Sequence, residues 1–149
     1  MEITNARLIL PDSVQRGSLS IRSGQIHKIS KNSELATNSK ESVMDLRGGF
    51  LAPGFVDLHI HGAMGRDTME ARLDAFREIT EFHLHGGTTS LTLTTLSAPQ
   101  DDILKALDAI APIRNRSIGG SRILGVHVEG PFISKEKAGA QNPNFVRNP

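Results

Sequence analysis

The sequence predicts an α/β fold in which parallel strands alternate with helices, preceded by a segment of short strands. Apolar runs typical of strands occur at residues 56–61, 88–96 and 122–129, and two stretches with helical spacing separate them. The first 49 residues instead contain short alternating runs and hairpin signals. Because strand–helix alternation favours parallel strands with right-handed crossovers, we expect a β segment at 1–49 and an α/β domain at 50–149.

The composition is that of an ordinary globular protein, and it argues against several functional classes. The chain has 149 residues, 38% of them hydrophobic and 22% charged, with a formal net charge of +1 and no basic run. Nothing therefore indicates binding to nucleic acid or to a membrane surface. No apolar stretch approaches ~18 residues, and the first ten residues are too polar for a secretory signal. Cysteine is absent, which excludes thiolate ligands and disulfides within the chain and fits a reducing cytoplasm.

Short strands and turns are expected along residues 1–46. A Pro-Asp break at Pro11 separates the first two alternating runs, and Ser23-Gly24 is a hairpin signal between the second and third. His27 lies in the last of these runs and is interpreted as a surface histidine. Residues 31–42 are rich in Ser, Asn, Lys and Glu, which predicts a loop.

Two helices are predicted between the strands of the second part. Apolar side chains recur at helical spacing over 69–85, and Gly86-Gly87 should end that helix. A second His-x-His, at His83 and His85, falls on this helix, where positions two apart do not share a face, so it is not predicted to bind metal. Pro99 stands near the start of the second helix. The buried side of that helix is predicted to carry Ile103, Leu107 and Ile110.

The strand at 56–61 carries the first candidate metal ligands. Polar and apolar residues alternate there, so a strand would place Asp57, His59 and His61 on one face and three apolar side chains on the other. Neutral imidazole is a common ligand for zinc, iron and nickel, and two neighbouring imidazoles make half of a metal site. An isolated His-x-His is more often a pair of histidines on a half-exposed strand. The Pro-Gly before this strand and the apolar run through it favour the metal site.

A carboxylate ends the third strand. Along 122–129, His127 and Glu129 should face the opposite way from the valines that alternate with them. Active sites of parallel barrels lie at the carboxyl ends of strands, so Glu129 would face the same mouth as His59 and His61. Two histidines and a carboxylate form a plausible hydrolytic metal set. Taken alone, such a carboxylate would more often cap a loop. We expect His127 to lie beside the ligands.

The stretch Pro-Gly-Phe-Val-Asp-Leu-His-Ile-His-Gly at 53–62 resembles the first barrel strand of the amidohydrolase superfamily. In that superfamily the His-x-His binds catalytic metal at the carboxyl end of the strand. The resemblance implies a metal-dependent (β/α)₈ TIM barrel, of which residues 50–149 would form the first three βα units. It also implies that residues 1–49 belong to a small β-sandwich that C-terminal strands complete. A whole barrel needs ~250 residues.

Two further stretches narrow the resemblance. His-Val-Glu-Gly-Pro-Phe-Ile-Ser at 127–134 and Lys-Ala-Gly-Ala-Gln-Asn-Pro-Asn-Phe-Val-Arg at 137–147 closely resemble the N-acetylglucosamine-6-phosphate deacetylase family. The resemblance is close over 50–147 and looser before it. The Glu-Gly-Pro block followed by Gly-x-x-Asn-Pro is far more specific than the His-x-His.

The resemblance assigns roles to particular residues. It implies that Glu129 is the primary ligand of the metal that activates water, and that Ala140 and Gln141 contact the substrate sugar. Several family members carry His at the position of Gln141. Some members lack the His-x-His and use one metal. Because this chain has His59 and His61, it resembles the branch of the family that can hold two ions. One or two divalent ions are therefore expected, with zinc first and iron or manganese as alternatives.

The family also takes two further metal histidines and a general acid/base aspartate from later strands, which would lie beyond Pro149. The chain is therefore interpreted as the N-terminal part of a deacetylase, and we expect it to be inactive alone. The complete protein would hydrolyse N-acetylglucosamine 6-phosphate to glucosamine 6-phosphate and acetate. It would be a cytoplasmic homodimer that binds this small amino-sugar phosphate as its substrate.

Two alternatives stay open on the sequence. One is another amidohydrolase that acts on a cyclic amide or a different acyl group, which would share the His-x-His but not the Glu-Gly-Pro block with its downstream Gly-x-x-Asn-Pro. The other is a non-catalytic fragment that binds metal weakly or only assembles with another chain. An in-frame continuation of the coding region after Pro149, with more strand-end histidines and an aspartate, would favour the enzyme.

Overall fold

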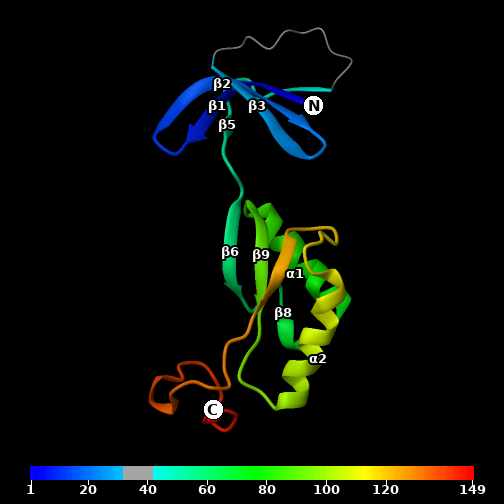
Figure 1. Ribbon diagram of the computed structural model, residues 1–149, viewed down its shortest axis with the longest axis vertical. Coiled ribbons are helices and arrows are strands. Elements are labelled where there is room, and N and C mark those ends of the chain that lie inside the picture. Colours follow the sequence, from blue (N-terminus) through cyan, green and yellow to red (C-terminus); the bar gives the residue numbers. More distant parts are fainter. Residues whose placement is uncertain (32–41) are drawn as a thin grey trace. The chain divides into compact units, whose positions relative to one another are not determined.

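The structure is a computed structural model that describes residues 1–31 and 42–149 (Figure 1). Most of the loop predicted over 31–42 lies outside the described residues. The fold is mixed α/β. The chain divides into two compact units, Met1–Pro53 and Gly54–Pro149, and each is described by itself. Among the described residues, no helix has the length and apolar character needed to cross a membrane.

The first unit is a five-stranded sheet. Its strands are β1 (Glu2–Leu10), β2 (Ser13–Arg22), β3 (Gln25–Lys31), β4 (Val43–Asp45) and β5 (Phe50–Leu51). The order is β3-β2-β1-β4, with β5 also paired to β1. β1, β2 and β3 pair antiparallel, whereas β4 and β5 run parallel to β1.

The turn between β2 and β3 confirms the predicted hairpin. Ser23 and Gly24 both have positive φ, at 50° and 74°. Two successive positive φ values are the backbone of a type I′ turn, whose twist matches that of the flanking strands. His27 lies on β3 and is exposed, as predicted. Phe50 and Leu51 pair with β1, so the first unit extends to Pro53 and thus past the predicted boundary at residue 49.

The second unit is built around three parallel strands and two α-helices. Its main elements are β6 (Phe55–Ile60), α1 (Leu73–His85), β9 (Thr88–Thr94), α2 (Gln100–Ile110) and β10 (Arg122–His127). The strand order is β10-β9-β6, and both pairings are parallel. This confirms the predicted order, with the strand from Thr88 between the other two. A small hairpin, β7 (Gly62–Ala63) and β8 (Arg66–Asp67), follows β6, and 3-10 turns occupy Thr68–Glu70, Ala111–Ile113 and Lys135–Lys137.

The core of the second unit lies between the strands and the helices (Figure 1). Phe76 and Ile79 from α1 and Ile110 from α2 are almost completely buried, together with Leu91 and Leu93 from β9. The remaining members of the buried cluster are Ile60 and Ile123. The predicted helical spacing thus identifies the correct buried face. The exception at the start of α1 is Leu73, which is exposed.

The first helix begins later than predicted. Residues 69–72 were expected to be helical, but α1 starts at Leu73. The side chain of Asp67 accepts from the amide of Met69, and Glu70 accepts from the amide of Asp67, which completes a capping box around one 3-10 turn. Ala71 then adopts the left-handed region at φ 55°, so the chain cannot continue as a helix.

The strict alternation predicted for β6 does not hold. Val56 and Leu58 are 60% and 61% exposed, and Ile60 alone of the three packs into the core, at 4%. The pairing of β6 with β9 shifts register between Phe55 and Val56 and again between Asp57 and Ile60. A strand with such irregularities does not keep a period of two along its length.

Candidate metal centre

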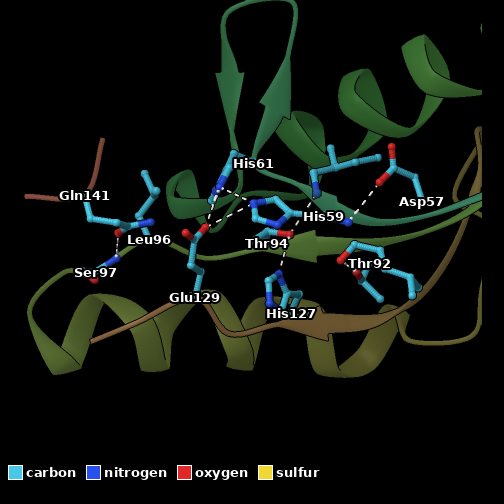
Figure 2. Close-up of polar contacts among 12 residues, drawn as sticks. Asp57, His59, His61, Thr92, Thr94, Leu96, Ser97, His127, Glu129 and Gln141 are labelled. Atoms are coloured by element: carbon cyan, nitrogen blue, oxygen red, sulfur yellow. Dashed lines mark hydrogen bonds and ion pairs between the residues drawn. The ribbon is translucent and has the colours of Figure 1, made fainter. Parts of the chain in front are cut away.

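The three predicted metal ligands converge on one point (Figure 2). The Nε2 atoms of His59 and His61 lie 3.0 Å apart. Glu129 Oε2 lies 3.2 Å from His59 Nε2 and 2.9 Å from His61 Nε2. The side chains are partly exposed, at 53% for His59, 32% for His61 and 29% for Glu129, so an ion or a ligand could reach them from solvent.

The parallel sheet explains this convergence. His59 is near the carboxyl end of β6, His61 directly follows that strand, and Glu129 lies two residues after β10. The carboxyl ends of parallel strands meet at one edge of a sheet, and β9 holds β6 and β10 at a fixed separation. Residues 68 positions apart in the sequence are thereby brought into contact.

The donor set suits a divalent transition metal. In a tetrahedral site with ligand bonds of ~2.0–2.1 Å, neighbouring ligand atoms are about 3.3 Å apart. The three separations here are 3.0, 3.2 and 2.9 Å. Glu129 Oε2 is buried, makes no hydrogen bond, and lies at ion-pair distance from the two imidazoles. A buried acceptor without a donor is an exception that a cation would resolve.

His127 lies beside the ligands. It is the last residue of β10, and its ring centroid is 4.9 Å from that of His59, with the two planes tilted by 59°. Its Nδ1 atom lies 3.5 Å from Thr94 Oγ1. The His127 ring thus contacts that of His59, but His127 does not belong to the group of three converging residues.

The residue after Glu129 must be glycine. Gly130 has a φ of 77°, and a Cβ at this position would overlap the side chain of Ser97. Side chains other than hydrogen would therefore collide with the loop that follows β9. This close approach gives a physical reason for the Glu-Gly sequence at the end of the third strand.

The structure does not bring Gln141 into the ligand group. Gln141 is 7% exposed, and its Oε1 accepts a hydrogen bond of 2.6 Å from the amide of Ser97 (Figure 2). It therefore ties its own segment to the loop after β9. Ala140, beside it, is exposed. Contact of Ala140 and Gln141 with a sugar stays a prediction.

Two threonines near the site were not singled out from the sequence. Thr92 and Thr94 both bond the backbone of β6 through their side chains. The run of β-branched residues over 88–96 predicted only a strand; its alternation of Thr with Leu was the signal that one face is polar. His83 and His85 lie in the last turn of α1 and are not among the converging residues.

No protein-family model matches the chain. Among curated proteins, the N-acetylglucosamine-6-phosphate deacetylase of Bacillus subtilis is 33% identical over 137 residues, covering 90% of this chain and 34% of the relative. The human protein of the same name is 31% identical over 151 residues, covering 99% of this chain and 37% of the relative. The chain matches the N-terminal portion of the N-acetylglucosamine-6-phosphate deacetylases. It spans about a third of the length of these relatives.

Solved structures of the same name agree with this match. The deacetylase from Thermotoga maritima is 35% identical, with a TM-score of 0.76 over 100% of this chain and 37% of that one. The deacetylase from Pasteurella multocida is 26% identical, with a TM-score of 0.85 over 98% of this chain and 38% of that one. A D-hydantoinase from Thermus is similar in fold alone, at 23% identity and a TM-score of 0.56 over 93% of this chain and 29% of that one. The chain thus has the fold of the matching part of these structures.

Proposed function

We propose that the full-length protein containing this chain is a metal-dependent deacetylase that converts N-acetylglucosamine 6-phosphate into glucosamine 6-phosphate and acetate. The observation that supports this most strongly is the convergence of His59, His61 and Glu129. The chain that carries them matches a deacetylase of this name over 99% of its own residues. One structure of a matching deacetylase, from Mycobacterium smegmatis, contains N-acetyl-D-glucosamine-6-phosphate.

In this proposal Glu129 is the primary ligand, and His59 and His61 hold a second ion or complete the same site. A divalent ion held there would lower the pKa of the attacking water and polarise the amide carbonyl. A carboxylate beside two imidazoles also contributes the negative charge that favours a cation over a neutral ligand. Zinc is the ion we expect first, with iron and manganese as alternatives.

Other residues of the chain would bind and orient the substrate. Ala140 is exposed and Gln141 is adjacent to it, so the two could offer backbone and amide groups to the sugar. Because Gln141 Oε1 is bonded to the Ser97 amide, its Nε2 group is the part that would reach a sugar hydroxyl. His127 would orient the ring of His59 through their 4.9 Å contact.

The rest of the site is proposed to come from later parts of the protein. Two further metal histidines and the general acid/base aspartate would follow Pro149. The three parallel strands would then be the first three of an eight-stranded barrel, with residues 1–49 in a sandwich completed by C-terminal strands. The full-length protein would be a cytoplasmic homodimer.

The test is an assay of the full-length protein for acetate release. We expect release from N-acetylglucosamine 6-phosphate, loss of activity after chelation, and recovery with added zinc, iron or manganese. N-acetylglucosamine without phosphate and a hydantoin serve as comparison substrates and should react far more slowly. Turnover that survives complete metal removal would contradict the proposal, as would a preference for the hydantoin.

A further inference from the structure

The backbone of β6 is irregular where it carries the first histidine. Leu91 and Leu93 of β9 pair with Asp57 and Ile60 of β6, so three steps along β6 match two steps along β9. One extra residue in a strand is a β-bulge, which bends the strand and can re-aim a side chain next to an active site. His59 lies within this bulge.

Two threonine hydroxyls of β9 bond the β6 backbone on either side of His59 (Figure 2). Thr92 Oγ1 donates to the carbonyl oxygen of Leu58 at 2.6 Å. The amide of Ile60 donates to Thr94 Oγ1 at 2.9 Å. These two side-chain bonds hold the strand at the residue before His59 and the residue after it, in addition to the backbone pairing of Ile60 with Leu93.

Asp57 adds a third hydrogen bond to the same bulge of β6. Its Oδ1 accepts from the amide of His59 at 3.0 Å. One polar backbone atom of each of residues 58, 59 and 60 is therefore bonded to a side chain that is not one of the converging groups. A bulge with these bonds has one defined conformation, because a buried amide left without an acceptor is costly.

Thr94 also reaches the third strand. Its side chain is fully buried. A hydroxyl has one proton and two lone pairs, so accepting the Ile60 amide leaves its proton available for His127 Nδ1, 3.5 Å away. The ring of His127 in turn lies against that of His59. One hydroxyl therefore links β6, β9 and β10 at the level of the ligands.

We propose that Thr92 and Thr94 are positioning residues, whose hydroxyls fix the bulge in β6 and thereby set the spacing of His59 and His61 for a metal ion. The inference rests on the proposed metal site. Ligands must be held within ~0.5 Å of their productive geometry, and partners outside the ligand shell supply that restraint. Loss of such partners typically weakens metal binding 10- to 100-fold.

The test compares zinc dissociation constants, measured by chelator competition on the full-length protein. Thr94→Val and Thr92→Val remove each hydroxyl while nearly keeping its shape, and Thr94→Ser restores it. Thr89→Val is the matched control, because Thr89 also lies on β9 but its hydroxyl is 3.5 Å from the Phe55 carbonyl, at the other end of β6. We expect Thr94→Val and Thr92→Val to bind zinc about 10-fold more weakly or worse. Thr94→Ser should recover the wild-type affinity, and Thr89→Val should not change it.

Hydrogen exchange of the 55–62 segment in the metal-free proteins provides a second readout. Thr92→Val and Thr94→Val should exchange faster in this segment than Thr89→Val does. A general loss of stability would not produce an increase confined to this segment. Equal zinc affinity and equal exchange in all variants would overturn the positioning role. Wild-type protein that binds no zinc, iron or manganese would instead overturn the proposed function. If Thr94→Val does not fold, Thr92→Val decides the outcome.

Discussion

The two units differ in how their sheets are covered. In the second unit, α1 and α2 pack on the sheet, and Phe76 and Ile79 are fully buried. In the first unit, no α-helix occurs among the described residues, and Val14 and Ile26 remain 59% and 62% exposed. An apolar hollow of about 240 Å³ lies on this sheet, lined by residues that include Leu19. The described residues therefore provide a covering layer for one sheet but not for the other.

This difference shows how a covered sheet can build a site. Along β9, Leu91 and Leu93 enter the core beneath the helices, while the alternating Thr92 and Thr94 bond β6. The packed side fixes the strands, and the polar side chains on the other side place the residues that carry chemistry. The first unit has the same kind of strands without this support, and none of its described residues belongs to the candidate metal centre.

The largest effect is expected from Glu129→Gln. An amide cannot replace the charge of a carboxylate ligand, so metal retention and deacetylation of the full-length protein should be lost together. Elemental analysis after dialysis measures metal retention, and the acetate assay measures deacetylation. Glu136→Gln is the matched control, because Glu136 is an exposed carboxylate in the 3-10 turn nearby. Full metal occupancy with normal turnover in Glu129→Gln would remove this residue from the site.

The next largest effect is a difference in stability between truncating a buried side chain in the second unit and an exposed one in the first. Phe76→Ala should lower the free energy of unfolding by about 3–5 kcal/mol, because it empties a fully buried site. Ile26→Ala in the first unit should change it by about 0.5 kcal/mol or less if that side chain is as exposed in the full-length protein as it is here. Denaturant unfolding of both variants checks the pair. A large loss for Ile26→Ala would show that another part of the protein covers the first sheet.

The sequence predicted the parts of this fold that depend on local pattern. The hairpin at Ser23-Gly24, the strand order, the end of α1 and the convergence of the ligands with Glu129 all followed from turn chemistry, periodicity and the geometry of parallel strands. The start of α1 was predicted too early, because a capping box at Asp67 closes a separate turn that apolar spacing alone does not distinguish from a helix.

The bulge in β6 could not be predicted, because it depends on partners from another strand. Alternation within 56–61 is unbroken in the sequence, whereas the register shift and the bonds from Thr92 and Thr94 appear only when β9 lies beside it. Likewise, nothing local indicates that Gln141 binds the Ser97 amide, 44 residues earlier in the chain. Long-range side-chain contacts of this kind carry no periodic signal.

A smaller effect is expected from Gln141→Ala. A sugar contact made equally in the ground and transition states raises KM, by about 10-fold, with little change in kcat. Gln100→Ala, at the exposed start of α2, is the control. A large fall in kcat at constant KM would instead place Gln141 in the chemistry, or show that the loop it ties through Ser97 positions a reacting group.

The smallest effect is expected from Asp74→Asn. Hydrogen bonds from Arg72 hold the pKa of Asp74 below its ordinary value of 3.8. A lowered folded-state pKa stabilises the fold above the ordinary pKa and loses that effect as the pH falls through the folded-state value. The variant should therefore melt slightly lower than the wild type at neutral pH, with the difference shrinking in acid and in high salt. Melting curves at several pH values measure it, and a difference that grows in acid would contradict the assignment.

The most direct test of the metal centre is anomalous scattering from crystals of the full-length protein grown with zinc. We expect a zinc-edge peak within ~2.0–2.2 Å of Glu129 Oε2 or of the Nε2 atoms of His59 and His61, with the threonine bonds to β6 retained. A map with zinc elsewhere, and with His59, His61 and Glu129 in contact only with one another, would contradict it.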